Sequence, residues 1–146
     1  RDYTTTDLNS PLADVVADIC DLPFQNNQYD LILCNHVLEH IPNDLKAMTE
    51  LYRVLKKGGT LIAQVPLDEE NTKTLENDSI NDPRDRTRFF GQYDHVRVYG
   101  LDFYARLAKS GFKPKKIDIL KEMSNEEKIK YCLPKDEKIP IGIAIK

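Results

Sequence analysis

The feature that most constrains the fold is a strand–helix–strand pattern in residues 29–65. Residues 29–34 are nearly all apolar, which predicts a strand buried on both faces of a sheet. Residues 43–55 carry apolar side chains at three- and four-residue steps, as in an amphipathic helix. Residues 60–65 then read as a second strand. Short joints between these three segments predict a parallel sheet with crossover helices.

The ends of the predicted helix carry recognisable signals. Asn43 or Asp44 can cap its first turn, because a side-chain oxygen there accepts a hydrogen bond from a free backbone N–H. Gly58 and Gly59 are expected to stop it, since glycine readily adopts the backbone conformation that ends a helix.

The rest of the chain continues the α/β pattern. Further strands are predicted at residues 3–6, 14–19, 115–120 and 139–145, with helices at 101–109 and near 125–131. Residues 68–88 are polar, and a connection of this length is usually a lid, a binding loop or a disordered segment. We therefore expect one domain over residues 1–146 with a lid or substrate insertion at 68–99.

Composition narrows the class of protein. The chain has 21 Lys and Arg against 24 Asp and Glu, a net charge of −3, which argues against a nucleic-acid-binding surface. There is no apolar run near 18 residues and no charged-then-apolar leader, so we expect no membrane span and no secretion. Three scattered cysteines do not form a disulfide framework and favour a cytoplasmic protein.

Polar residues follow the predicted strands where ligands bind in open α/β sheets. Asp7, Asp18 with Ile19, and Asn35 with His36 occupy these positions. The two carboxylates could accept hydrogen bonds from a ribose diol and from an exocyclic amine. The alternative, favoured by composition alone, is that they only terminate strands or cap turns.

A metal site is a second alternative at this end of the sheet. His36 and His40 would share a helix face and could hold zinc, with Cys34 or Cys20 adding sulfur. However, Glu39 does not stand where a His-Glu-x-x-His hydrolase needs it, and the Ile-Pro pair that follows breaks a helix. We therefore expect no metal ion, and an inert thiol at Cys34.

Residues 92–99 form a further polar cluster after the lid. It contains His95, Arg97 and two tyrosines, one of them Tyr93. The cluster is either part of a substrate site or simply the polar rim of a loop.

Four segments, in their order and spacing, resemble the class I S-adenosylmethionine-dependent methyltransferases. They are Asp-Ile-Cys-Asp-Leu-Pro-Phe at 18–24, Tyr-Asp-Leu-Ile-Leu-Cys-Asn at 29–35, Val-Leu-Glu-His-Ile at 37–41 and Leu-Tyr-Arg-Val-Leu-Lys-Lys-Gly-Gly at 51–59. The resemblance implies a Rossmann-like fold, with a mostly parallel sheet and an antiparallel C-terminal strand.

The resemblance also implies a cofactor site for S-adenosylmethionine. Asp7 would accept hydrogen bonds from the ribose hydroxyls and Asp18 from the adenine amine, with Ile19 packing on the base. Leu8, Asn35 and His36 complete the implied set of cofactor-binding residues. The family's first strand and glycine-rich loop have no counterpart in this chain. We therefore expect a C-terminal portion of a longer domain that is inactive alone.

The expected activity is methyl transfer to a small-molecule acceptor by in-line displacement. His95 or His36 are the candidate bases, because imidazole titrates near neutral pH. Arg86, Tyr93 and Arg97 are the candidate substrate-binding residues. The alternative function is a methyltransferase-like binding module without activity.

Overall fold

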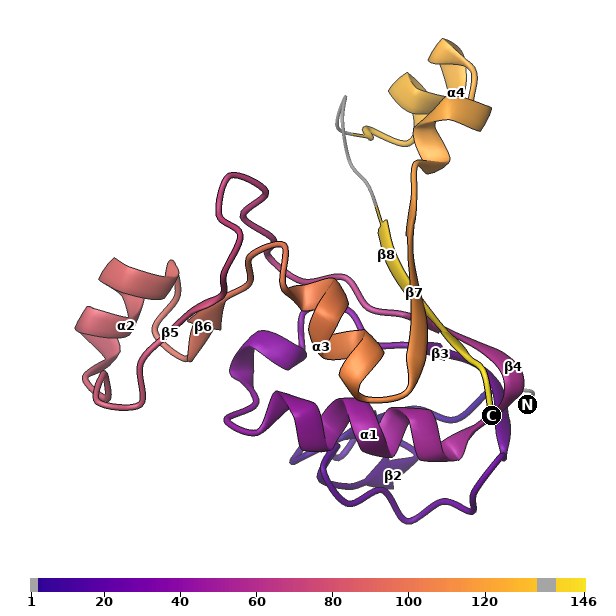
Figure 1. The fold of residues 1–146 in the computed structure, drawn as a ribbon, viewed down its shortest axis with the longest axis horizontal. Coiled ribbons are helices and arrows are strands. Elements are labelled where there is room, and N and C mark those ends of the chain that lie inside the picture. The colour runs from indigo at the N-terminus through magenta and orange to yellow at the C-terminus, as the bar shows by residue number, and fades with distance from the viewer. Residues whose placement is uncertain (1–2, 134–138) are drawn as a thin grey trace.

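The structure is a computed structural model that describes residues 3–133 and 139–146 (Figure 1). Two short strands open the chain, and a strand, a 3₁₀ turn, a helix and a long strand follow them. The first elements are β1 (Thr6–Asp7), β2 (Val15–Val16), β3 (Tyr29–Leu33), η1 (Leu38–His40), α1 (Asp44–Val54) and β4 (Leu55–Ile62). The later ones are β5 (Leu75–Glu76), α2 (Pro83–Phe90), β6 (Arg97–Val98), α3 (Phe103–Lys109), β7 (Phe112–Ile117), η2 (Ile119–Glu122), α4 (Asn125–Lys130) and β8 (Ile139–Ala144).

The largest sheet has four strands in the order β3-β4-β8-β7. β3 pairs parallel with β4, whereas β8 pairs antiparallel with both of its neighbours. β3, β4 and β7 therefore run in one direction and β8 in the other. This arrangement confirms the predicted α/β fold with an antiparallel final strand, but the sheet is mixed rather than mostly parallel, because both neighbours of β8 pair with it antiparallel. β1 and β2 pair in parallel in a separate two-stranded sheet.

Helices α1 and α3 lie side by side over one face of the four-stranded sheet (Figure 1). Leu61 of β4 and Ala63, just beyond the strand, belong to this core and are fully buried. The helices contribute their apolar faces to the same core, chiefly through Met48, Leu51, Phe103 and Leu107. The apolar residues that recur along α1 therefore form the helix face that packs into this core.

The predicted burial of the first long strand on both faces is wrong. The side chains of Leu31 and Leu33 in β3 are 52% and 65% exposed. β3 is an edge strand of its sheet, and within the described residues the helices that pack on the sheet cover only the opposite face. The apolar run therefore reflects a strand with one buried face and one open face.

Helix α1 ends earlier than predicted. Asn43 caps its start as expected, because its side-chain oxygen accepts a hydrogen bond from the Lys46 N–H. Its last residue is Val54, and Leu55 already has extended dihedral angles and is fully buried as the first residue of β4. Gly58 and Gly59 therefore lie inside the strand. Leu55 pairs with Tyr29 of β3 and is buried there, so the helix ends before the chain reaches the two glycines.

The remaining boundaries also differ from the predictions. β1 and β2 are shorter than the segments predicted at 3–6 and 14–19, because only two residues of each pair in register. β7 begins at Phe112, three residues before the predicted start, and residues 119–122 form a 3₁₀ turn in place of the end of that strand. Within the described residues, no helix has the length and apolar character that crossing a membrane requires.

The segment between β4 and α3 is an ordered unit that extends away from the sheet (Figure 1). β5 and β6 pair antiparallel, and α2 lies between them in sequence. Asp82 caps α2, Pro83 occupies its first turn, and Gly91 ends it in a left-handed conformation. These local signals explain why a polar connection folds into a helix and a β-ribbon.

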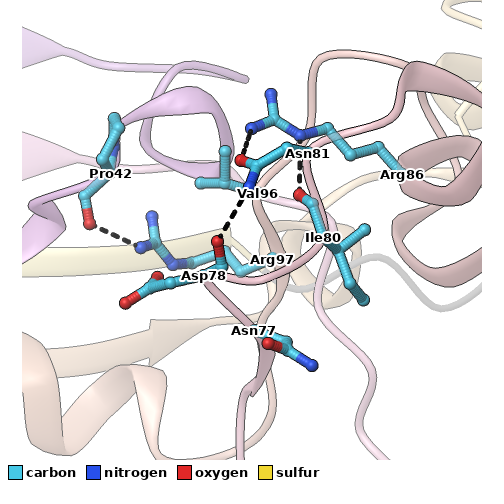
Figure 2. A pocket seen from close by; sticks show the side chains of 8 residues that line it. All are labelled: Pro42, Asn77, Asp78, Ile80, Asn81, Arg86, Val96 and Arg97. Carbon is cyan, nitrogen blue, oxygen red and sulfur yellow. Dashed lines mark hydrogen bonds between the residues drawn. The ribbon is translucent and has the colours of Figure 1, made fainter.

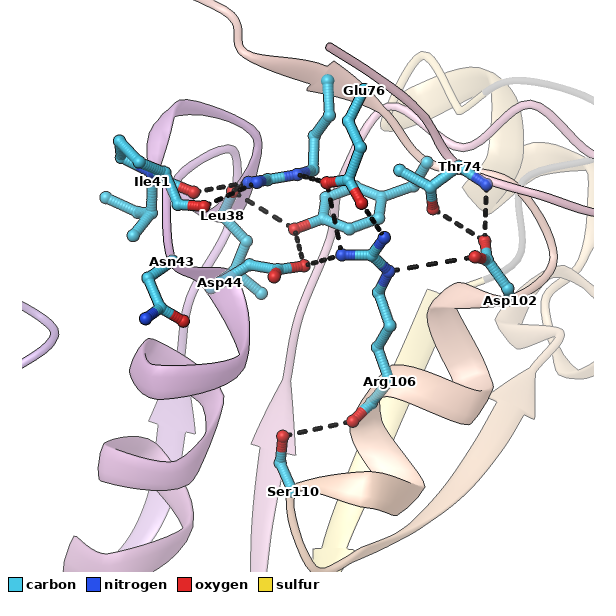
Figure 3. A network of polar contacts seen from close by, with 12 residues as sticks. Leu38, Ile41, Asn43, Asp44, Thr74, Glu76, Asp102, Arg106 and Ser110 are labelled. Atoms are coloured by element: carbon cyan, nitrogen blue, oxygen red, sulfur yellow. Dashed lines mark hydrogen bonds and ion pairs between the residues drawn. The ribbon is translucent and has the colours of Figure 1, made fainter. Parts of the chain in front are cut away.

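A network of buried ion pairs fastens this unit to α1 and α3 (Figure 3). Arg106 of α3 lies between Asp44, 2.9 Å away at the start of α1, and Glu76 of β5. Arg97 of β6 donates a 3.0 Å hydrogen bond to Glu76 as well. Burial raises the pKa of Glu76, but hydrogen bonds from the two arginines outweigh it and leave that pKa below its usual value. Ion pairs and charged hydrogen bonds therefore hold β5 and β6 against α1 and α3.

Candidate functional site

The carboxyl ends of β1 and β2 bring the two predicted cofactor carboxylates to one edge. Asp7 is the last residue of β1, and its register partner is Val16 at the end of β2. Asp18 follows two residues later, and both side chains are exposed. Leu8 is exposed beside Asp7, whereas Ile19 packs against the main core. The structure therefore brings Asp7 and Asp18 to one edge of this small sheet, and cofactor binding by the four residues stays a prediction.

Each carboxylate also stabilises its own turn. Oδ1 of Asp7 accepts hydrogen bonds from the backbone N–H groups of Asn9 and Ser10, at 2.8 and 2.7 Å. These two bonds hold the pKa of Asp7 below its usual value. Oδ1 of Asp18 likewise accepts from the Cys20 N–H at 2.8 Å. The turn-capping alternative is therefore correct for Oδ1 of both residues.

Asn35 and His36 lie just beyond the carboxyl end of β3. The parallel ladder continues past the strand, because the His36 N–H donates to the Gln64 carbonyl at 2.8 Å. His36 has a left-handed backbone with φ of 53°, a conformation that is costly for a residue other than glycine. Strained residues of this kind cluster at functional sites. The side chain of His36 is 59% exposed.

Beyond His36 the chain forms a cluster of imidazoles and carboxylates. Glu39 lies in the η1 turn with its side chain 1% exposed, and its Oε1 is 3.4 Å from Nδ1 of His36. One ligand atom each of Glu39, His40 and His95 lies within 4.8 Å of the others. The rings of His40 and His95 meet edge to face with centroids 4.7 Å apart. The two predicted bases, His36 and His95, therefore both lie close to the Glu39 carboxylate.

Backbone contacts bring His95 to this turn. The N–H of Val96 donates to the Glu39 carbonyl at 2.9 Å. Arg97 then donates to the carbonyls of Ile41 and Pro42, which fixes the end of the same turn. Glu39 was given no role from the sequence, because it does not stand at the glutamate position of a His-Glu-x-x-His motif. The spacing of His36, Glu39 and His40 is the sequence signal for this cluster. His95 joins the cluster through a long-range contact, which the sequence does not show.

The predicted inert character of Cys34 agrees with its surroundings. Its side chain is buried, and burial together with the nearby Glu39 carboxylate raises the pKa of the thiol to about 12. A thiol with such a pKa is protonated at neutral pH and is a poor nucleophile.

A cavity of about 240 Å³ lies between the insertion and the η1 turn (Figure 2). Arg86 and Arg97, two of the predicted substrate-binding residues, both line it. Arg86 donates to the carbonyl of Ile80 and to Asn81, whereas the Arg97 guanidinium is 3% exposed and bound to three carbonyls and Glu76. Tyr93 is exposed on the surface and does not line this cavity. The remaining lining residues are Pro42, Asn77, Asp78, Ile80, Asn81 and Val96.

Comparison with known proteins identifies the class to which this fold and site belong. A family model described as a methyltransferase domain matches residues 3–63, which include every residue of the predicted cofactor set. The ubiquinone/menaquinone biosynthesis C-methyltransferase of Psychromonas ingrahamii is 31% identical over 121 residues, covering 81% of this chain and 45% of that protein. An uncharacterised protein of Methanocaldococcus jannaschii is 51% identical over 51 residues, covering 35% of this chain and 22% of that protein.

Solved structures share the fold at low sequence identity. Phosphoethanolamine N-methyltransferase 2 of Haemonchus contortus, solved with S-adenosylhomocysteine, gives a TM-score of 0.52 at 14% identity, covering 88% of this chain and 36% of that one. The [4+2]-cyclase SpnF gives 0.57 at 15% identity, covering 89% and 56%. The domain is therefore a Rossmann-like methyltransferase fold. Residues 3–63 match the methyltransferase-domain family, so this part of the chain is similar to the class I S-adenosylmethionine-dependent methyltransferases, and the chain spans less than half the length of the curated relatives named here.

Proposed function

We propose that the protein transfers a methyl group from S-adenosylmethionine to a small-molecule acceptor by in-line displacement. The observation that carries this proposal is the family match over residues 3–63, combined with polar side chains at the carboxyl ends of three successive strands. Ligands of open α/β sheets bind at this edge. The substrates of relatives range from quinone precursors to phosphoethanolamine, so the fold does not specify the acceptor.

The residues at the strand ends suit the adenosine part of the cofactor. Asp7 is exposed and its pKa is lowered by two backbone hydrogen bonds, so it is an ionised acceptor that suits ribose hydroxyls. Asp18 would accept from the adenine amine, with Leu8 and Ile19 offering apolar contact to the nucleoside. Asn35 and His36 would lie beside the methionine part. When bound, the cofactor supplies an activated methyl group on a sulfonium.

Positioning is the main contribution of a protein to such a displacement, with at most one general base. We propose His36 as that base, because its imidazole is exposed at the end of β3 and stands 3.4 Å from the Glu39 carboxylate. A carboxylate at this distance can orient the imidazole ring. His95 is only 8% exposed and its Nδ1 is 3.0 Å from the Phe90 carbonyl, so its role as a base stays a prediction.

We place the acceptor on the side of the insertion. Arg86 lines the cavity and Tyr93 is exposed nearby in sequence, so both are available to an anionic or hydroxylated acceptor. The buried donors of Arg97 are used by carbonyls and by Glu76, so we propose that it shapes the wall of this site rather than binding the acceptor.

Calorimetric titration of the intact protein with S-adenosylhomocysteine tests the cofactor assignment. In Asp7→Asn and Asp18→Asn the amide oxygen can still accept the local turn hydrogen bonds, but the charge is lost. We expect each variant to weaken binding roughly 10-fold, the worth of about 1.4 kcal/mol for a charged hydrogen bond. The matched control is Asp21→Asn, an exposed carboxylate three residues beyond Asp18.

Unchanged affinity in both variants would show that the cofactor assignment is wrong. Transfer of the labelled methyl group to small molecules of a cell extract, measured with the intact protein, tests the activity separately. Retained cofactor binding without any transfer would favour the binding-module alternative.

A further inference from the structure

The most unusual feature of the interior is the carboxylate of Glu39. Its side chain is 1% exposed, and within the described residues neither of its oxygens receives a hydrogen bond. Nδ1 of His36 lies 3.4 Å from Oε1 but outside hydrogen-bonding geometry. A buried carboxylate is costly unless it is paired, hydrogen-bonded or bound to a metal ion. Within the described residues, the buried carboxylate of Glu39 therefore has no hydrogen-bond donor.

Two imidazoles converge on this carboxylate. A ligand atom of His40, one of His95 and one carboxylate oxygen of Glu39 all lie within 4.8 Å of one another. Donor atoms around a zinc ion at about 2.1 Å are roughly 3.4 Å apart, so small side-chain rotations would close the set around one ion.

Both imidazoles are oriented by an oxygen atom on the opposite side of the ring. Nδ1 of His95 lies 3.0 Å from the Phe90 carbonyl, which can only accept, so this nitrogen carries the proton. Nδ1 of His40 lies 3.3 Å from Oδ2 of Asp94. This arrangement leaves the lone pair on Nε2 of each ring. Metal-binding histidines almost always donate their second nitrogen to a carbonyl or carboxylate in this way.

We propose that Glu39, His40 and His95 bind one divalent transition-metal ion. Two imidazoles and a carboxylate suit zinc and its first-row neighbours, whereas magnesium and calcium prefer oxygen ligands. The two nearby carboxylates, Glu39 and Asp94, balance the charge of the ion. Three protein ligands leave a coordination position open, and the exposed imidazole of His36 or a solvent molecule can occupy it.

The surrounding structure holds these ligands in place before an ion arrives. The Val96 N–H binds the Glu39 carbonyl, and Arg97 binds carbonyls at both ends of the η1 turn. The segment that carries His95 is therefore fixed to the turn that carries Glu39 and His40. This site replaces the expectation of no metal, and it differs from the arrangement of His36, His40 and a cysteine considered from the sequence. It does not depend on the proposed methyl transfer.

Zinc binding by the intact, chelator-treated protein tests the proposal. We expect calorimetry to give one ion per chain, and Glu39→Gln, which keeps the size of the side chain, to weaken binding roughly 100-fold. Glu126→Gln on the exposed face of α4 and Cys132→Ser, which removes the exposed thiol, are the matched controls and should bind as the wild type does.

Thermal unfolding supplies a second measurement. Zinc should raise the melting temperature of the wild type, because an ion that binds only the folded state stabilises it. Without metal, Glu39→Gln should melt no lower than the wild type, since neither oxygen of the buried Glu39 side chain receives a hydrogen bond that the variant could lose. A structural role for the carboxylate predicts the opposite order.

The proposal is overturned if the wild type binds no stoichiometric zinc or cobalt at concentrations well above that of the protein. It is equally overturned if Glu39→Gln binds normally, or if Cys132→Ser alone abolishes binding. Should Glu39→Gln fail to fold, the visible spectrum of the cobalt-loaded wild type decides. Nitrogen and oxygen ligands support the site, and a thiolate charge-transfer band contradicts it.

Discussion

The hydroxyl of Tyr99 donates a 2.9 Å hydrogen bond to Oδ2 of Asp44, and both side chains are buried between α1 and the insertion. Arg106 donates to the same oxygen at 2.9 Å, so one carboxylate oxygen joins α1, α3 and the end of the insertion just after β6. Burial and the Asp44 charge both raise the pKa of Tyr99, which keeps its hydroxyl protonated as a donor. The start of α1 is thus the anchor of the insertion (Figure 3).

This relationship predicts a large effect of Asp44→Asn on stability. The variant leaves the buried guanidinium of Arg106 without its full charge partner, so the free energy of unfolding should fall by about 3 kcal/mol. Tyr99→Phe removes one hydrogen bond to a charged acceptor and should cost about 1–2 kcal/mol. Urea denaturation measures both.

The control for this pair is Tyr93→Phe, because Tyr93 is exposed and its hydroxyl should contribute little. If Asp44→Asn is no less stable than that control, the ion pair does not hold the insertion in solution.

Stability should depend on pH through Glu50. Hydrogen bonds from Arg53 hold the pKa of Glu50 below its ordinary value of 4.5. Because the folded-state pKa is depressed, the stabilisation is complete above about pH 4.5 and is lost as the pH falls through the lower folded-state pKa. The stability difference between the wild type and Glu50→Gln should therefore shrink as the pH falls below 4.5.

Chemical denaturation at neutral and at acidic pH measures this difference. Glu126→Gln, an exposed carboxylate on α4, should give a small difference at both pH values. A Glu50→Gln effect that persists unchanged in acid would contradict the assignment to the charged pair with Arg53.

The left-handed backbone of His36 predicts an unusual ranking of substitutions. His36→Asn and His36→Gly should keep or raise stability, since these residues tolerate φ near 53°. His36→Val should be about 1–2 kcal/mol less stable than His36→Asn, because β-branched residues resist this conformation. Denaturation midpoints measure the ranking, and equal stability of the Val and Asn variants would exclude backbone strain at this position.

Two glycines separate backbone strain from a steric clash. Gly91 and Gly111 both have positive φ after a helix, but a Cβ on Gly91 would meet no atom within 4 Å. A Cβ on Gly111 would lie 2.8 Å from the ring of Tyr52. Gly91→Ala should therefore cost about 1–2 kcal/mol, and Gly111→Ala about 2–4 kcal/mol. Thermal or urea unfolding compares them, and equal costs would show that the ring of Tyr52 moves aside freely.

Local patterns predicted most of the fold correctly. The apolar period and the Asn43 cap gave helix α1, and the apolar runs gave β3 and the strand after α1, since these signals act between near neighbours in sequence. The boundary at Val54 was missed because burial of Leu55 depends on β3, which no local signal reports. Exposure of Leu31 and Leu33 was missed for the same reason: covering a sheet face is a property of the whole domain.

The candidate site divides in the same way. The amino-acid sequence was enough to place Asp7, Asp18 and His36 at or just beyond strand ends, because strand ends are set by local pattern. Long-range packing brings His95 to Glu39 and His40, and it buries Arg97 against three backbone carbonyls. Those contacts join segments far apart in the chain. Their geometry depends on how the insertion packs against the η1 turn, and long-range packing leaves no periodic trace in the sequence.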